Sequence, residues 1–280
     1  LNAMTKPPFE ERWPRPSVMG VVNVTPDSFS DGGLYVESSA AVEHARRLLA
    51  EGAALVDVGG ESTRPGAAPV SADEELARVL PVLEGLAGLP ISIDTSKALV
   101  AGAALGRGAQ LVNDVTALRG DPAMVEVIAD ADAYVCLMHM QGSPRTMQVA
   151  PSYDDVVGDV FAFLEERVAF AVEHGVREDR ICVDPGIGFG KTPDQNLELL
   201  RCLDELKALG RPVLVGVSRK STLEKVVGDA GATRAGVAAS VAAAVAAFDR
   251  GATMIRAHDV GETVEALAVA AAVERGKITA

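Results

Sequence analysis

The chain has 280 residues and is poor in aromatic side chains, in histidine, in cysteine and in positive charge. Lysine and arginine together number 26 against 39 aspartates and glutamates, which gives a formal net charge of −13. So acidic a protein repels the phosphate backbone of a nucleic acid and offers no broad basic face to an anionic membrane. We therefore expect neither nucleic acid nor membrane as a partner, and any anionic ligand must be held by a local cluster of cations.

Cysteine occurs only at Cys136, Cys182 and Cys202, without a C-x-x-C pair. These residues lie far apart in apolar sequence, so we expect free, buried thiols in a reducing compartment, with no metal and no redox function. Long hydrophobic runs are also missing. The longest run rich in alanine and valine, 235–248, is too short for a membrane span, and no signal peptide precedes Val18. These features predict a cytoplasmic protein.

Short apolar runs alternate with segments in which apolar residues have helical spacing. The apolar runs lie at 18–22, 54–58, 91–94, 110–113, 133–138, 181–183, 212–217 and 252–255. One strand and one helix thus recur every ~34 residues, eight times in all. The pattern predicts a single-domain α/β protein with the (β/α)8 TIM-barrel fold.

An open, doubly wound sheet would show the same alternation and is the alternative, although no G-x-G-x-x-G follows the first strand. Leu1, Asn2 and Ala3 resemble a cloning scar, and 7–16 has the character of a poorly ordered lead-in. We therefore expect a lead-in over 1–16 and the barrel over 17–280. Helix starts are predicted at Asp121-Pro122 and Thr192-Pro193, where a capping side chain precedes a proline.

Polar side chains stand at the end of nearly every predicted strand. They are Asn23, Thr63, Arg64, Asp94, Asn113, Asp114, His139, Asp184, Ser218, Arg219, Lys220, Arg256 and His258. In a parallel barrel the carboxyl ends of all strands surround one mouth, so these residues should converge on one pocket. Asp94 or Asp184 alone could be a helix cap or a turn residue, but capping does not explain polar groups after so many strands.

Two kinds of chemistry are present in this set. Carboxylates, an amide and a lysine suit a flat heterocycle with several N–H and C=O groups; they are Asp94, Asn113, Asp184 and Lys220. Cationic and hydroxyl side chains suit a phosphate or a diphosphate; they are Thr63, Arg64, Arg219, Arg256 and His258. The sequence therefore predicts one pocket for a polar ring and an anionic leaving group.

The first strand runs directly into a polar loop that ends in Gly32 and Gly33. The loop contains Asn23, Thr25, Pro26, Asp27, Ser28, Ser30 and Asp31, which are turn formers that cannot continue a buried strand. It is either an ordinary connection between strand and helix or a mobile catalytic segment.

Eight motifs between about 18 and 273 carry a close resemblance to dihydropteroate synthase. They are M-G-V-V-N-V-T-P-D-S-F-S-D-G-G from Met19, D-V-G-G-E-S-T-R-P-G from Asp57, I-D-T from Ile93, V-N-D-V from Val112, L-M-H-M-Q-G from Leu137, V-D-P-G-I-G-F-G-K-T from Val183, G-V-S-R-K-S from Gly216 and R-A-H-D-V from Arg256. The first, second and sixth motifs are long and specific. The resemblance implies a TIM-barrel transferase of folate synthesis, in a family that sulfonamides target.

The reaction implied by the resemblance joins 4-aminobenzoate to 6-hydroxymethyl-7,8-dihydropterin diphosphate and releases diphosphate. The implied pterin site consists of Asp94, Asn113, Met138, Asp184, Phe189, Gly216 and Lys220. The implied diphosphate site consists of Asn23, Thr63, Arg64, Arg256 and His258, with Asn23 as a ligand of a Mg²⁺ cofactor. The implied aminobenzoate site consists of Phe29, Thr63, Pro65, Phe189 and Ser221.

Asp31, Arg64 and Lys220 are the residues to which the resemblance assigns catalysis, and a homodimer is implied as well. We expect the C–O bond to diphosphate to ionise before the amine attacks, because the electron-rich dihydropterin stabilises the adjacent cation. No covalent intermediate with the protein is then needed. The alanine-rich stretch 236–247 is either a helix packed against its neighbours alone or a dimer contact.

Two other functions remain open from the sequence. One is a pterin-binding methyltransferase barrel of the kind that handles methyltetrahydrofolate, against which the loop before Gly33 and the turn 218–221 argue. The other is a paralogue that binds pterin without turnover, against which five intact residues argue: Asn23, Asp31, Arg64, Lys220 and Arg256.

Overall fold

The computed structural model describes residues 6–25, 33–63, 66–143, 145–228 and 236–278. Its strands are β1 Ser17–Asn23, β2 Leu55–Gly59, β3 Ile91–Asp94, β4 Leu111–Asp114, β5 Tyr134–Met138, β6 Ile181–Asp184, β7 Leu214–Gly216 and β8 Met254–Ala257. Its α-helices are α1 Phe9–Arg12, α2 Gly33–Ala50, α3 Ala72–Gly85, α4 Ala98–Leu105, α5 Met124–Asp130, α6 Val156–Glu173, α7 Pro193–Arg201, α8 Ser221–Val227, α9 Val237–Asp249 and α10 Val260–Arg275. Short 3₁₀ helices occupy Glu178–Arg180 and Leu203–Leu209.

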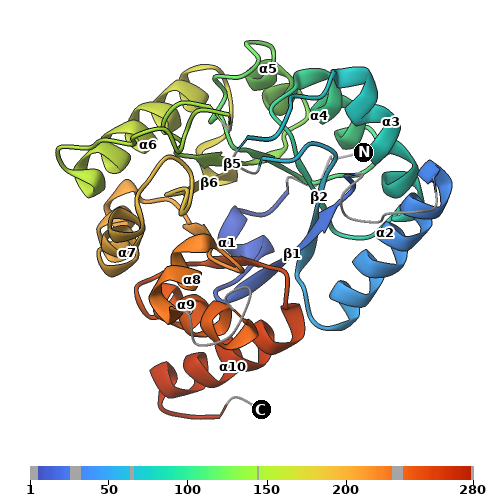
Figure 1. Cartoon of the computed structure of the whole chain (residues 1–280). Helices are drawn as coiled ribbons and strands as arrows, with labels where there is room; N and C mark the ends of the chain where they lie inside the picture. The colour runs from blue at the N-terminus through green and yellow to red at the C-terminus, as the bar shows by residue number, and fades with distance from the viewer. Residues whose placement is uncertain (1–5, 26–32, 64–65, 144, 229–235, 279–280) are drawn as a thin grey trace.

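The eight strands are parallel and follow the order β6-β5-β4-β3-β2-β1-β8-β7. The two ends of this sheet meet at a single bridge between Val183 and Val213, so the barrel is nearly closed. Helices surround the strands (Figure 1). The predicted TIM barrel is confirmed, and an open sheet with helices on two faces is not what the chain forms. No helix in the described part of the chain is both long and apolar enough to cross a membrane.

Alternation of side chains along each strand sorts the barrel interior into layers. The strand starts contribute apolar groups that pack together: Met19, Leu55, Leu111, Tyr134, Leu214 and Met254. Two residues further along, the inward positions of β2, β4 and β8 carry Asp57, Asn113 and Arg256, and the ends of β3 and β6 carry Asp94 and Asp184. The interior is therefore apolar at the amino ends of the strands and polar at their carboxyl ends.

The expectation of a poorly ordered lead-in is wrong for residues 7–16. Phe9 and Trp13, on either end of α1, are buried with the apolar layer at the strand starts. Both rings pack edge-on against Tyr134 of β5, with centroids 6.0 and 4.7 Å away respectively. In Figure 1, α1 lies across the centre of the barrel. This short helix thus covers the apolar end of the barrel, where the strands alone would leave large side chains exposed.

Of the two helix starts predicted before a proline, the structure confirms one. Thr192 and Gln195 form a complete capping box at the start of α7. The helix expected after Asp121 begins later, at Met124, and Asp121 instead accepts hydrogen bonds from Ala123 and from the backbone N–H of Ala98. Asp121 therefore satisfies a free N–H at the start of α4, a tertiary contact that local sequence cannot reveal.

Candidate active site

One pocket at the carboxyl ends of the strands gathers six of the thirteen polar residues predicted from the strand ends. It is lined by Thr63, Asp94, Asn113, Val115, Met138, Asp184, Gly186, Ile187, Phe189, Gly216, Lys220 and Arg256. The strand register accounts for this, because Asp94 is level with Asn113, Met138 with Asp184, and Gly216 with Arg256. The seven residues expected to hold a pterin all lie in the lining. Thr63 and Arg256, expected at the diphosphate, join them there.

Arg256 crosses the polar layer and binds two carboxylates. Its Nε donates to Asp57 Oδ2 at 2.7 Å, and one Nη donates to Asp94 Oδ2 at 2.9 Å. Asn113 also donates to Asp57 Oδ2, at 2.9 Å, while Asp57 Oδ1 is buried without a hydrogen-bond partner among the described residues. Asp57 therefore holds both Arg256 and Asn113 in place, a function that the sequence reasoning did not assign to it.

Burial raises the pKa of Asp94 to about 7, and the neighbouring Asp57 carboxylate acts in the same direction. The Arg256 guanidinium opposes that rise. Burial would lower the pKa of Arg256, but Asp57 and Asp94 more than compensate and the pKa lies above its ordinary value. The pair of acids thus keeps Arg256 charged, and Asp94 is poised to exchange a proton near neutral pH.

Asp184 lies on the opposite side of the pocket, at the end of β6. Burial raises the pKa of Asp184 to about 6. Two groups oppose this rise: the backbone N–H of Gly186, which donates to Asp184 Oδ1 at 2.7 Å, and the charge of Lys220. Lys220 Nζ stands 4.3 Å from the centre of the Phe189 ring, and burial followed by repulsion from Arg256 lowers the Lys220 pKa to about 8. A carboxylate, an ammonium and an aromatic face therefore converge on one flat space.

Seven predicted residues in the described part of the chain stand outside this lining: Asn23, Asp114, His139, Ser218, Arg219, Ser221 and His258. Asn23 ends β1 at the rim, and Ser221 is the first residue of α8. His258 follows β8, and its Nδ1 lies 3.1 Å from Ser218 Oγ. Burial and the charge of Arg256 lower the pKa of His258 to about 3, so its imidazole is neutral in the ligand-free protein. Arg219, considered for an anion, is paired with Asp259 instead.

Four predicted residues lie outside the described part of the chain. They are Phe29, Asp31, Arg64 and Pro65.

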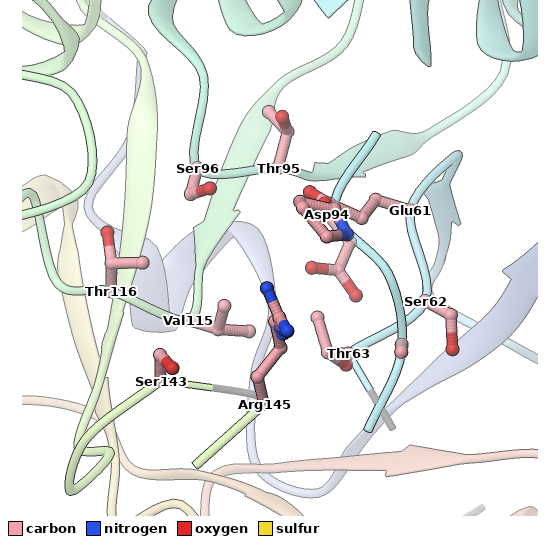
Figure 2. Close-up of a pocket in the computed structure, with 12 residues that line it drawn as sticks. Glu61, Ser62, Thr63, Asp94, Thr95, Ser96, Val115, Thr116, Ser143 and Arg145 are labelled. Carbon is pink, nitrogen blue, oxygen red and sulfur yellow. The ribbon is translucent and has the colours of Figure 1, made fainter. Parts of the chain in front are cut away.

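A second hollow of about 180 Å³ adjoins the pocket and shares Thr63, Asp94 and Val115 with it. Its other walls come from the segments after β2, β3, β4 and β5 (Figure 2). Glu61 at its edge is held by Lys97, whose Nζ lies 2.6 Å from Glu61 Oε2 and 2.6 Å from Glu75 Oε2. This partly buried ion triad, in which only Glu75 is fully buried, fixes the start of the loop that carries Thr63, and the sequence reasoning did not single it out.

Carboxylates, an amide and a lysine that line one pocket at the mouth of a barrel suit a flat heterocycle with several N–H and C=O groups. The family model described as pterin binding enzyme matches residues 19–258. The chain belongs to this family.

Among curated proteins, dihydropteroate synthase of Neisseria meningitidis serogroup B is 49% identical, with 93% of this chain and 94% of the relative covered. The Escherichia coli K12 dihydropteroate synthase is 47% identical, with 91% and 90% covered. A solved structure of Xanthomonas albilineans dihydropteroate synthase with 4-aminobenzoic acid is 49% identical, covers 93% of this chain and 94% of that one, and superposes with a TM-score of 0.86. The same enzyme in complex with 7,8-dihydropteroate is 46% identical over the same shares, with a TM-score of 0.82.

The function of the chain is that of dihydropteroate synthase, a transferase of folate biosynthesis. Both alternatives that the sequence left open, a methyltransferase barrel and a paralogue without turnover, give way to this function.

Proposed function

We propose that the pocket bounded by Asp94 and Asp184 holds the pterin ring of 6-hydroxymethyl-7,8-dihydropterin diphosphate, which the chain condenses with 4-aminobenzoate. The observation that supports this most is that Asp94 and Asp184 line one pocket together with Phe189 and Lys220, which contact each other on the β6–β7 side. A pterin carries ring N–H and amino donors as well as a carbonyl and ring nitrogens, so it needs carboxylates and a cation together. Release of diphosphate that requires both substrates tests the complete reaction.

The transfer proceeds by ionisation of the C–O bond to diphosphate, followed by attack of the amine. The bond electrons leave with the diphosphate, and the dihydropterin ring stabilises the methylene cation that remains. Arg256 and Thr63, which line the pocket, and His258 beside it would meet the departing diphosphate, and a neutral His258 would donate a hydrogen bond, not a full charge. Acid quenching during turnover with labelled pterin substrate should leave no label on the protein. Label bound covalently would refute this order of events.

Asp31 and Arg64 are proposed to complete the site from the two loops that lie outside the described residues. Arg64 would bind the departing diphosphate, and Asp31 would stabilise the cation or orient the amine. Phe29, Pro65, Phe189 and Ser221 would surround the aminobenzoate, where a sulfonamide would compete with it. The variant Asp31→Asn should lower turnover while pterin binding is retained. Unchanged turnover would remove Asp31 from the mechanism.

Mg²⁺ is proposed as the cofactor, with Asn23 as its protein ligand. The described residues contain no group of three or more His, Cys, Asp or Glu that could hold a metal ion. A single amide oxygen at the rim nevertheless fits Mg²⁺, which keeps several waters and is held mainly by substrate phosphates. When bound, the ion would neutralise charge on the diphosphate. The variant Asn23→Ala should raise the Mg²⁺ concentration needed for half-maximal activity, with pterin affinity measured without metal unchanged.

We also propose a homodimer that uses α9 and α10, and a cytoplasmic location. Val269 and Val273 of α10 are 62% and 76% exposed, and Val245 of α9 lines a shallow groove beside Val269. Exposed valines on one helix favour a contact between copies over a helix packed only within its own chain. Equilibrium sedimentation should give twice the chain mass, and Val269→Glu with Val273→Glu should give the single mass. The free thiols of Cys136, Cys182 and Cys202 fit a reducing compartment.

A further inference from the structure

Lys191 is a buried cation beneath the loop that follows β6. Its side chain is only 2% exposed, and it does not line the pterin pocket. Its Nζ lies 2.9 Å from His139 Nδ1 and 3.0 Å from each of the carbonyl oxygens of Gly186 and Phe189. Among the described residues, no carboxylate lies within ion-pair distance of this ammonium. Lys191 is therefore held by backbone carbonyls and one imidazole, an arrangement that costs desolvation without an ion pair to offset it.

His139 supplies the fixed side of this contact from the end of β5. Burial, followed by the charge of Lys191, lowers the pKa of His139 to about 3, so the ring is neutral. Burial also lowers the pKa of Lys191 to about 7, and the charge of Asp184 opposes that fall. In its protonated form Lys191 donates to Nδ1, which then accepts, and the ring proton is on Nε2. The ring also packs edge-on against Phe163, at 4.8 Å between centroids. His139 is thus a rigid acceptor against which Lys191 holds the β6 loop.

The loop held in this way carries groups that face the pocket. Gly186 has φ +68° and lies so close to β5 that a Cβ would come within 1.9 Å of the His139 carbonyl oxygen. The same Gly186 donates its N–H to Asp184, and its carbonyl accepts from Lys191. At the other end of the loop, the Phe189 carbonyl accepts from Lys191 while its ring lies under Lys220. One ammonium therefore connects both ends of the loop to β5.

We propose that Lys191 is a positioning residue for the transferase, which holds the loop 185–190 against His139 and so fixes Asp184 and Phe189 around the pterin. It acts through these two residues and does not itself touch the substrate. Removal of the ammonium leaves three acceptors without their donor, and the loop then shifts towards water or towards Lys220. The inference rests on the proposed pterin site, because it assigns to Asp184 and Phe189 the contacts that Lys191 preserves.

The first test is Lys191→Met, which keeps the linear side chain and removes the charge. Pterin affinity, measured by calorimetry with a dihydropterin ligand, should weaken about 10- to 100-fold, because a displacement of about 1 Å in a binding group has effects of this size. The matched control is Arg180→Met. Arg180 is equally buried and also donates to backbone carbonyls, those of Lys6 and Pro7, but at the opposite end of the barrel. It should lower the melting temperature and leave pterin affinity within twofold.

A double-mutant cycle that combines Lys191→Met with Phe189→Leu distinguishes the positioning of Phe189 from a general loss of protein stability. If Lys191 acts through Phe189, Lys191→Met should weaken pterin binding much less in the Phe189→Leu background than in the wild-type background. Additive effects, or a Lys191→Met protein that melts lower but binds pterin normally, would overturn the inference. Should Lys191→Met fail to fold, Lys191→Gln takes its place, because it keeps two N–H donors. It should also weaken pterin binding, by a smaller factor. A different result would contradict the pterin site itself: unchanged pterin affinity in the Asp184→Asn variant.

Discussion

The substitution Asp184→Asn separates charge from shape at the centre of the pterin pocket. Gly186 donates its N–H to Asp184 Oδ1 at 2.7 Å in the native protein. An asparagine keeps that hydrogen bond only with its carbonyl oxygen, so its NH₂ group must then face the pocket. A pterin ring N–H and amino group would meet a donor in place of a carboxylate acceptor.

The loss in affinity follows from this reversal. Hydrogen bonds to a charged group contribute about 1.5 to 3 kcal/mol each, and two of them would be lost. We expect about 3 to 6 kcal/mol, equivalent to roughly 150- to 20,000-fold weaker pterin binding. The free energy of unfolding, in contrast, should rise in the Asp184→Asn variant. Because burial raises the Asp184 pKa from 3.8 to about 6, the buried charge costs up to about 3 kcal/mol at pH 7.5, and the neutral amide avoids that cost.

The assay is calorimetric titration of a dihydropterin ligand at pH 7.5, together with thermal unfolding of the same samples. Asp114→Asn is the matched control. Asp114 is a buried carboxylate at the end of β4, but it accepts hydrogen bonds from Thr116 and Leu118 and does not line the pocket. The control should retain pterin affinity. An Asp184→Asn protein that binds pterin within tenfold of wild type would refute the assignment of Asp184 as the charged acceptor.

Three further predictions follow from the same structure. Pterin affinity should fall by more than about tenfold between pH 7.5 and pH 5, because Asp184, with a pKa of about 6, and Asp94, with a pKa of about 7, both become protonated and lose their charge as the pH falls; affinity that is flat or rises on acidification contradicts this. Trp13→Ala should lower the free energy of unfolding by about 3 to 5 kcal/mol in denaturant titration, with pterin affinity unchanged, and a smaller loss would mean that α1 does not cover the apolar layer. Gly186→Ala should yield little soluble protein, since its Cβ would lie 1.9 Å from the His139 carbonyl oxygen; normal expression and pterin binding would show that the loop can move aside.

Much of the site was predictable because a parallel barrel turns sequence order into spatial order. Once the apolar runs were taken as strands, Asp94, Asn113, Asp184 and Arg256 had to share one rim, and they do. Lys220 was predictable for the same reason, since it follows β7 directly. Neither prediction needed any knowledge of side-chain contacts.

Residues that act through a distant partner escaped the sequence reasoning. Asp57 lies inside a buried strand, and its importance comes from Arg256, which is 199 positions away. Lys191 follows a glycine-rich turn and has no charged partner nearby in sequence that would mark it. Phe9 and Trp13 have the i, i+4 spacing of a helix, but one such pair among prolines and charged residues does not establish a period. Their burial depends on the open apolar end of the barrel.

The helix α8 was also missed, because Ser221–Val227 is too short to display an apolar period and lies between the β7 turn and the alanine-rich helix. Its first residue, Ser221, nevertheless had a predicted function. Short helices of this kind are set by the turn before them, and sequence periodicity does not detect them.

The single bridge between Val183 and Val213 gives the barrel a seam, and the seam runs through the binding pocket. Asp184 is attached to one margin of the seam, while Gly216 and Lys220 are attached to the other. A small change in the distance between the two margins would alter the width of the ring-binding pocket, while the seven pairings that join the eight strands stay hydrogen-bonded. Amide protons along the seam should accordingly exchange with solvent sooner than those of β1 and β2, and a bound pterin, which touches both margins, should slow that exchange.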